Sequence, residues 1–205
     1  MPLDSTQLTA LVLGVSFASG LNVYLTVGAL GMLSRFGALT LPASLHPVAS
    51  WYVIVSCAIL FAMEFVADKI PIFDLVWNAL QTFVRIPVAA LLAYGATHQL
   101  SPQLQLLATL LGGAIALAAH GGKMAARTAV SHSPEPFSNS ALSLAEDSLV
   151  IFLTWIATRH PYWTSAIVLF SVLIVVVLVR FVIRAVHALF VGADQAVSRA
   201  LDSGG

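Results

Sequence analysis

The sequence predicts an all-α membrane protein: a bundle of about six transmembrane helices in one domain over residues 1–191. Only 9% of the 205 residues are charged and 59% are hydrophobic, whereas soluble domains carry about a quarter charged residues. Mean hydropathy is +0.94. Apolar stretches of about 20 residues, enough to cross a hydrocarbon core of about 30 Å, alternate with short segments that contain proline and charged residues.

The first three spans are delimited by residues that end helices. Residues 8–33 form the first span, which ends before Arg35. After a proline-containing loop, residues 49–67 form the second span. The string Asp68–Pro71 stops it, because proline lacks the N–H that a helix interior needs. Residues 73–97 form the third span.

The remaining spans follow the same pattern. Residues 103–126 form the fourth, and the proline-rich connection Ser133–Pro136 separates it from the fifth, residues 139–158. Aromatic residues precede the sixth span, residues 164–190, as expected at a membrane interface. Residues 192–205 are predicted to be a polar cytoplasmic tail.

The distribution of Lys and Arg predicts the orientation, because cytoplasmic loops carry an excess of these residues. With six spans, both termini share one side with the second-to-third and fourth-to-fifth loops. The opposite side holds only Arg35 and Arg159. The sequence therefore predicts that the N- and C-termini are both cytoplasmic. The basic residues assigned to that side are Lys69, Lys123, Arg127, Arg180, Arg184 and Arg199.

Two pairs of similar strings suggest an internal repeat. Phe17–Gly20 resembles Ala118–Gly121, and Ala67–Pro71 resembles Ala157–Pro161. Two three-helix units would be inverted relative to each other, an arrangement found in secondary transporters with a site at the bilayer midplane. The alternative is coincidence, because small residues and helix-ending prolines are common in membrane proteins.

Polar residues of the fifth span are costly inside a membrane, so they face the bundle interior or water. The apolar part of this span is too short to cross alone, and a helix starting at Asn139 includes Glu146 and Asp147 on one side. Alternatively, Ser143 and Glu146 form a capping box that opens a half-helix, with a broken or re-entrant segment near 133–147. Both interpretations place Glu146 close to the membrane interior.

The third span carries a polar stripe. Its apolar part is also short, and the polar residues upstream recur at helical spacing on one narrow face. Such a stripe lines a pathway or pairs with another polar helix, and the alternative is an amphipathic helix that lies on the membrane surface. The stripe consists of Asp74, Asn78, Gln81 and Arg85.

The fourth span places His120, Lys123 and Arg127 on one face. These cations could pair with Glu146 and Asp147 of the fifth span and neutralise them. In the alternative interpretation Lys123 and Arg127 extend to the cytoplasmic surface, and Arg127 is the one for which that outcome is favoured.

The first two spans contribute Asn22 and Glu64. An Asn in mid-membrane commonly hydrogen-bonds across helices, so a structural role for Asn22 stands beside contact with a substrate. Glu64 lies one helical turn deeper than Asp68. We expect Asp68 and Lys69 at the interface and Glu64 within the membrane.

Five strings spread over most of the chain form a distinctive pattern, which includes Pro-Glu-Pro and Glu-Asp. They are Gly20–Tyr24, Glu64–Pro71 with Asp74, Arg85–Pro87, Ser133–Asn139 and Ser143–Asp147. Together they resemble a bacterial family of integral membrane proteins catalogued only as a domain of unknown function, number 4126. The resemblance implies a polytopic protein of the bacterial inner membrane, and it implies no activity.

Three hypotheses for the function are open. The first is a small transporter or channel with a carboxylate-containing intramembrane site for a proton-coupled or cationic small solute. The second is a structural or assembly protein whose polar stripes only hold the helices together, and the third is an intramembrane enzyme acting on a lipid-linked substrate. The candidate substrate- or ion-binding residues are Glu64, Arg85, Glu146, Asp147, Lys123, Asn22, Asn139, Asp74, Asn78 and His120.

No catalytic residue, metal site or cofactor is predicted, because the His residues are scattered and the single Cys57 excludes a thiolate cluster. The formal net charge of zero argues against a nucleic-acid partner and leaves membrane lipids as the expected surroundings. A homodimer through Gly112–Gly113 and Gly121–Gly122 is a further expectation. A transporter predicts a hydrated cavity at the buried charges, whereas a structural protein predicts that they are fully paired.

Overall fold

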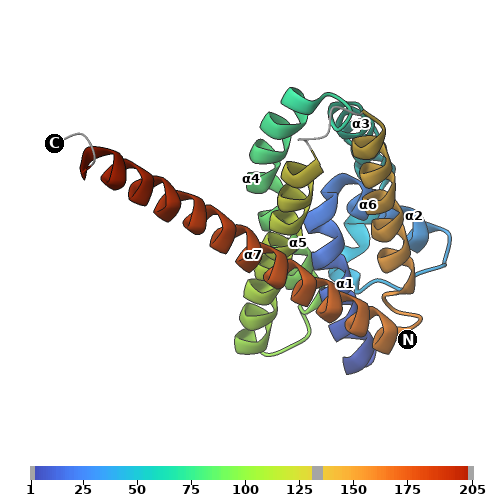
Figure 1. The fold of residues 1–205 in the computed structure, drawn as a ribbon. Coiled ribbons are helices and arrows are strands. Elements are labelled where there is room, and N and C mark those ends of the chain that lie inside the picture. Colours follow the sequence, from blue (N-terminus) through green and yellow to red (C-terminus); the bar gives the residue numbers. More distant parts are fainter. Residues whose placement is uncertain (1–2, 131–135, 203–205) are drawn as a thin grey trace.

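The computed structural model is helical throughout its described elements, as the sequence predicts (Figure 1). It describes residues 3–130 and 136–202, with the backbone alone at 71–72, 74–75, 128–130, 136–139, 182, 185–186 and 188–202. The elements are α1 (Ser5–Leu21), α2 (Val23–Arg35), the 3₁₀ helix η1 (Ala43–Ala49), α3 (Trp51–Ala67), α4 (Pro71–Ala96), α5 (Pro102–Val130), α6 (Pro136–Ile156) and α7 (Pro161–Asp202).

The first predicted span is broken at Asn22. The backbone of this residue is extended, with φ −150° and ψ 102°, so that α1 ends and α2 begins there. Its side-chain oxygen accepts a hydrogen bond from the backbone N–H of Leu25 at 3.0 Å. Asn is a preferred N-cap residue because it satisfies an N–H that the start of a helix leaves unpaired.

α1 and α2 form a helical hairpin with its apex at the break (Figure 1). At the base of the hairpin, the Gln7 side chain donates to the carbonyl of Thr158 at 3.2 Å. Beside it, Arg159 donates to the carbonyl of Ala38 at 3.2 and 3.3 Å. The start of α1 and the residues after α2 therefore lie together, next to the end of α6.

Neither leg of the hairpin is long enough to cross a membrane. The 17 residues of α1 and the 13 of α2 correspond to about 25 Å and about 20 Å of helix, against a hydrocarbon core of about 30 Å. The prediction of one crossing over residues 8–33 is therefore wrong, because Asn22 breaks an otherwise apolar stretch to form a cap. The break predicted near 133–147 is also wrong for its described part, since α6 is continuous from Pro136.

The other helices run between two ends of the bundle (Figure 1). One end carries the base of the hairpin together with the α4–α5 and α6–α7 connections, and we call it the hairpin-base end. The opposite end carries the α3–α4 connection at Lys69, the end of α5 and the start of α6, and we call it the Lys69 end. α7 begins at the hairpin-base end and extends well beyond the other helices.

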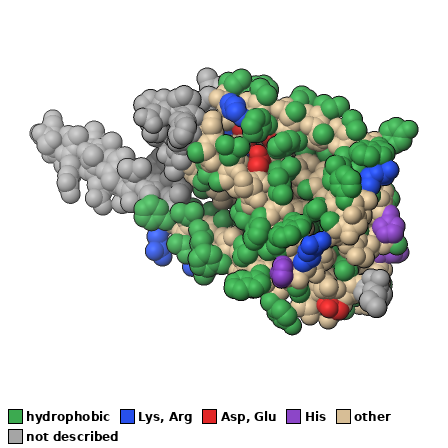
Figure 2. Space-filling model, turned by 90° about the vertical axis from the view of Figure 1, so that its right-hand side faces the viewer, with side chains coloured by type: hydrophobic (Ala, Val, Ile, Leu, Met, Phe, Trp, Pro, Cys, Tyr) green, Lys and Arg blue, Asp and Glu red, His purple; other side chains and the backbone are tan. Residues whose placement is uncertain are grey.

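The helices and the surface are those of a membrane protein, although the six predicted crossings are matched only in part. A fourth helix is long and apolar enough only if η1 and α3, bent by 60°, count as one span. Large apolar side chains cover the outside, and Figure 2 shows them spread over one face among few charged groups. The described helices that could cross by length and composition are Val76–Ala96, Pro102–Arg127 and Pro161–Phe181.

The second to sixth predicted spans each overlap one helix, α3 to α7 in order. The largest difference is at α7, which continues as helix through residues 192–202 of the predicted tail, whereas α5 ends four residues later than predicted and α6 begins three residues earlier. Proline suits the first position of a helix, because its fixed φ is helical and its missing N–H has no partner there. The helices that begin at proline are α4, α5, α6 and α7.

Glycines allow close contacts between the helices. A Cβ on Gly20 would lie 2.4 Å from the carbonyl oxygen of Ala116 in α5, so the hairpin apex packs directly on the α5 backbone. A Cβ on Gly112 would lie 2.7 Å from an α4 side chain, and one on Gly122 would lie 2.5 Å from an α7 side chain. The homodimer stays a prediction, but Gly112 and Gly122 are occupied by contacts within the chain and are not free to form it.

Gly20→Ala should destabilise the protein, because the added methyl group overlaps the Ala116 carbonyl. We expect a loss of about 1–3 kcal/mol, measured as a lower Tm of the protein in detergent. Gly121→Ala is the matched control, since nothing lies within 4 Å of its Cβ position. That change should be neutral or stabilising by up to about 1 kcal/mol. Equal losses in the two variants would contradict the close approach at the apex.

Candidate functional site

Charged side chains converge between the hairpin apex and the Lys69 end. The Arg85 guanidinium of α4 donates to Glu64 of α3 at 2.5 Å. The Lys123 ammonium of α5 lies 3.5 Å from the same Glu64 oxygen. Two helices therefore each place a cation on one fully buried carboxylate.

One helical turn further, a second set of ion pairs joins α3, α5 and α6. Arg127 donates to Asp68 at 2.7 Å and to Glu146 at 3.1 Å. Lys123 links the two sets, at 3.6 Å from Asp68 and 3.3 Å from Glu146. We call the following six residues the ion-pair network: Glu64, Asp68, Arg85, Lys123, Arg127 and Glu146.

His120 extends this network toward the centre of the bundle. Arg85 donates to its Nδ1 at 2.9 Å, and a guanidinium group can only donate, so Nδ1 carries no proton. The ring proton is therefore on Nε2, which lies 2.7 Å from the hydroxyl oxygen of Thr82. The Thr82 hydroxyl in turn donates to the carbonyl of Asn78 at 3.4 Å. These contacts define His120 as the neutral Nε2–H tautomer.

The hairpin apex lies against the network, so that the end of α1 and the start of α2 face its charged groups. Lys123 donates to the carbonyl of Leu21 at 3.1 Å, and Arg85 donates to the preceding carbonyl at 3.5 Å. Both carbonyls belong to the last turn of α1, where unpaired carbonyls and the helix dipole favour cations. Across the break, the Asn22 amide donates to Asp147 of α6 at 3.1 Å, and the start of α2 favours such an anion.

The network is almost entirely shielded from solvent. Glu64 and Arg85 are 0% exposed and Lys123 is 3% exposed, whereas Glu146 and Asp147 are 9% exposed. A charge at mid-membrane costs at least about 2.5–3.5 kcal/mol on insertion scales, and a buried charge without a partner costs more. Mutual pairing allows the six side chains of the ion-pair network to lie inside the bundle.

Some buried polar atoms near the network have no hydrogen-bond partner in the described structure. Most buried polar groups in proteins are paired, so atoms of this kind mark places where water or a polar ligand would bind. Arg85 and Glu64, although paired with each other, each have one such atom without a hydrogen-bond partner. The atoms include Glu64 Oε2, Arg85 Nε, Gln81 Oε1, Ser16 Oγ and Ser19 Oγ.

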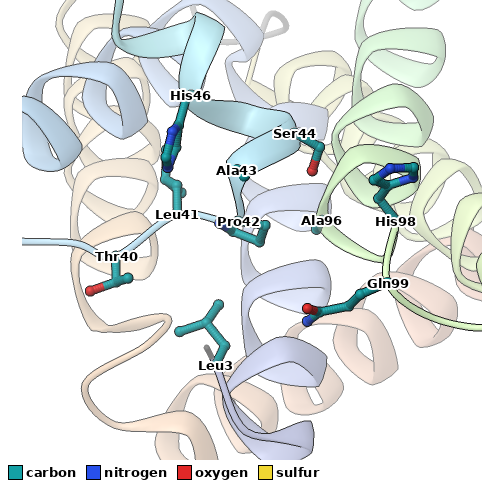
Figure 3. Close-up of a pocket in the computed structure, with 10 residues that line it drawn as sticks. All are labelled: Leu3, Thr40, Leu41, Pro42, Ala43, Ser44, His46, Ala96, His98 and Gln99. Atoms are coloured by element: carbon teal, nitrogen blue, oxygen red, sulfur yellow. The ribbon is translucent and has the colours of Figure 1, made fainter. Parts of the chain in front are cut away.

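The described hollows lie away from the network. Of five hollows in the described part of the chain, none is lined by the ion-pair network or by Asp147. One of about 370 Å³ lies at the hairpin-base end, where Leu3, His46 and His98 surround it (Figure 3). Among the described side chains, no three His, Cys, Asp or Glu residues are grouped to hold a metal ion.

The structure brings together eight of the ten residues that the sequence predicts as binding residues. The side chains of the other two, Asp74 and Asn139, lie outside the described residues. The eight are Asn22, Glu64, Asn78, Arg85, His120, Lys123, Glu146 and Asp147.

Two residues that the sequence places at the membrane surface belong to the buried network. Asp68 is 2% exposed and Arg127 is 3% exposed, because each finds its counter-charge within the bundle. The residue spacing contained the signal. Asp68 caps the end of α3 four residues after Glu64, and Lys123 and Arg127 are likewise four residues apart on α5, so that two matched faces meet. The predicted pairing of span four with span five holds for Glu146, whereas the described partner of Asp147 is an amide.

Two alternatives considered for the polar segments are excluded. Ser143 lies within α6 rather than at its start, and its hydroxyl donates to Asp68 at 3.1 Å, so it does not open a capping box. The polar stripe of α4 is buried inside the bundle at Asn78, Gln81 and Arg85. An amphipathic helix lying on the membrane surface would leave that stripe exposed to water.

Residues 9–181 match the family described as a domain of unknown function, number 4126. The chain belongs to this family. No curated protein and no solved structure matches the chain. The region shared with the domain of unknown function 4126 begins within α1 and ends within α7, so it includes the hairpin and every residue of the ion-pair network.

Arg85→Met should destabilise the protein strongly, because it leaves Glu64 buried with only the more distant Lys123. Removing one partner of a buried ion pair costs about 3–5 kcal/mol, measurable as a lower Tm in detergent. Adding Glu64→Gln to this variant should restore part of the loss.

The matched control is Arg35→Met, since Arg35 is exposed and stacks on Trp51 with 4.5 Å between guanidinium and ring centre. We expect a loss of about 1 kcal/mol or less there. A similar loss in both single variants, or no recovery in the double variant, would contradict the electrostatic account of the network.

Proposed function

We propose that this protein is a small transporter for a proton-coupled or cationic solute, with its site where the hairpin apex meets the ion-pair network. The observation that carries the proposal is the break at Asn22, which ends two helices inside the bundle beside buried charges. Discontinuous helices whose free ends face charged groups form the substrate and ion sites of many secondary transporters.

The backbone at the apex supports this proposal. Irregular backbone at membrane depth is tolerated only where it is buried in protein or lines a cavity. Here Lys123 and Arg85 occupy the carbonyls at the end of α1, and the same cations are held by carboxylates of α3 and α6. A cation that binds these carboxylates would compete with Lys123 and so loosen the apex, which couples binding to a helix movement.

The fold also supports a specific topology. In the proposed arrangement α3 to α7 cross the membrane, and the hairpin enters from one side and returns. The Lys69 end carries more basic residues than the hairpin-base end, which has Arg35 and Arg159. By the positive-inside rule the Lys69 end faces the cytoplasm. Five crossings place the start of α1 on the opposite side, in contrast to the two cytoplasmic termini predicted from the sequence.

The inverted repeat stays a prediction that one of its two pairs of similar strings supports. The helices that carry the other pair, α1 and α5, both begin at the hairpin-base end and so are not inverted relative to each other. The similar strings Ala67–Pro71 and Ala157–Pro161 each form a short turn that leads into a helix beginning at proline. The two turns lie at opposite ends of the bundle (Figure 1), as an inverted pair of units requires.

A structural or assembly role is the second candidate, and one observation favours it. The three cations of the ion-pair network contact three carboxylates within the described structure, and no described hollow reaches them. Pairing of opposite charges in this way would serve a protein whose polar side chains only hold its helices together.

Ion and solute flux in proteoliposomes separates the two candidates. We expect wild-type protein to move protons or a small cation under a pH gradient, and Glu64→Gln to lower the rate by about tenfold to a hundredfold. This range corresponds to the roughly 1.5–3 kcal/mol that a hydrogen bond to a charged group contributes. The Tm of each variant is measured in parallel, and Glu146→Gln replaces Glu64→Gln if the latter does not fold.

The matched control is Asp4→Asn. Asp4 caps α1 at the hairpin-base end, outside the network, and Asn is an equally good cap. This variant should keep the wild-type rate. The transport proposal is contradicted if the vesicles show no flux of protons, alkali cations or small organic cations and Glu64→Gln lowers only the Tm. That result would favour the structural role.

Cysteine labelling tests the topology. In a Cys57→Ser background, we expect Ser5→Cys and Gln99→Cys to react with a membrane-impermeant maleimide on intact cells. Lys69→Cys should react only after the cells are opened, because it lies at the other end of the bundle. Labelling of Ser5→Cys together with Lys69→Cys would contradict a hairpin that returns to its own side.

A further inference from the structure

We propose that the coupling ion is the proton and that Asp147 is the group that binds it. The inference rests on the proposed transport function and specifies the ion of the same site. In the binding step H⁺ forms an O–H bond with the carboxylate of Asp147, whose charge changes from −1 to 0, and no other covalent bond forms or breaks.

Asp147 is the carboxylate of the site that has no cationic partner in the described structure. In the described structure, Glu64, Asp68 and Glu146 contact the three cations of the ion-pair network. The partner of Asp147 is instead the neutral amide of Asn22, which bonds one of its two carboxylate oxygens. A buried charge without a counter-charge is costly, and binding a proton removes it.

The charges that face Asp147 do not supply the missing compensation. Lys123 of α5 is shared with three other carboxylates. The two α3 carboxylates of the network act on Asp147 with like charge, as does its neighbour Glu146. From the hairpin, its hydrogen-bond partner among the described residues is the Asn22 amide, and residues 161–179 of α7 contain no ionisable side chain except Tyr162.

A metal cation suits this position less well than a proton. Hard cations require several oxygen ligands, about six for Mg²⁺ and six to eight for Ca²⁺. The carboxylates near Asp147 are already bound by Lys123 and Arg127, which would also repel a metal. A proton requires one oxygen, and Asp147 has a second carboxylate oxygen without a hydrogen-bond partner among the described residues.

His120, the other titratable group at the centre, is held neutral by its contacts. Its Nδ1 accepts from Arg85 and its Nε2 donates to Thr82. A second proton would have to bind Nδ1, where it would face the N–H of the Arg85 guanidinium. The role of His120 is therefore to position Arg85 for Glu64, and the proton goes elsewhere.

Proton binding at Asp147 reaches the backbone through Lys123. The hydrogen bond from Asn22 persists, because a protonated carboxyl group still has an oxygen that accepts. Loss of the negative charge weakens the electrostatic attraction on Lys123, which holds the Leu21 carbonyl at the end of α1. Protonation is thereby linked to the contact that fixes the hairpin apex.

Infrared difference spectroscopy of the purified protein tests the assignment, because a protonated carboxyl group has a C=O stretching band that a carboxylate lacks. Spectra are compared between about pH 6 and about pH 8, because exposed carboxyl groups, with pKa values of about 3.9 for Asp and about 4.3 for Glu, stay ionised throughout that range. We expect a carboxyl band in the wild type at the lower pH and none in Asp147→Asn. Asn still accepts from Asn22, so the variant should fold, and Asp4→Asn should keep the band.

Isotope labelling gives a second route that needs no variant. The wild-type band should shift when aspartate carboxyl carbons are labelled with ¹³C and stay in place when glutamate is labelled. A band that persists in Asp147→Asn or shifts only with labelled glutamate overturns the assignment. Flux that depends on the Na⁺ gradient and not on the pH gradient also overturns the assignment.

The outcomes for the site and for transport are separable. A titrating band on Asp147 in a protein without flux would contradict the transport proposal and leave Asp147 as a proton-binding group. Proton-driven flux with the band on another residue would support transport and overturn the role of Asp147.

Discussion

The buried site depends above all on the ammonium group of Lys123. It lies near carboxylates of α3 and α6 and donates to the Leu21 carbonyl at the end of α1. One cation thus compensates buried negative charge and also satisfies backbone that the break at Asn22 leaves open. Each need would be costly by itself. Because the same group meets both, the ion pairs and the hairpin apex stabilise each other.

The hairpin divides the bundle into two unlike halves. Between the apex and the Lys69 end, charged residues from α3, α4, α5 and α6 pair with one another. Between the apex and the hairpin-base end, α1 packs through apolar residues such as Leu8, Leu11 and Val15. A polar region therefore reaches from one end into the centre and stops at the apex. Passage of an ion through the remaining half would require the first helix to move.

The hairpin apex is tightly packed, although some buried polar atoms near it have no hydrogen-bond partner in the described structure. Gly20 packs on the α5 backbone so closely that a methyl group has no space, and His120 fixes the direction of the Arg85 guanidinium. Yet Glu64 Oε2 and Arg85 Nε lack partners in the described structure, although buried polar atoms are normally paired.

The sequence alone determined the membrane class, the helical class and most helix positions, because about 20 consecutive apolar residues and helix-starting prolines are local signals. It also identified most of the polar residues that meet, since charges inside apolar segments must face inward. Only the tertiary structure decided that residues 8–33 turn back at Asn22, because an apolar stretch looks the same whether it crosses or returns. The tertiary structure also decided that Asp68 and Arg127 are buried. The two residues pair with each other across 59 residues of the chain, and a local sequence pattern does not predict such a long-range contact.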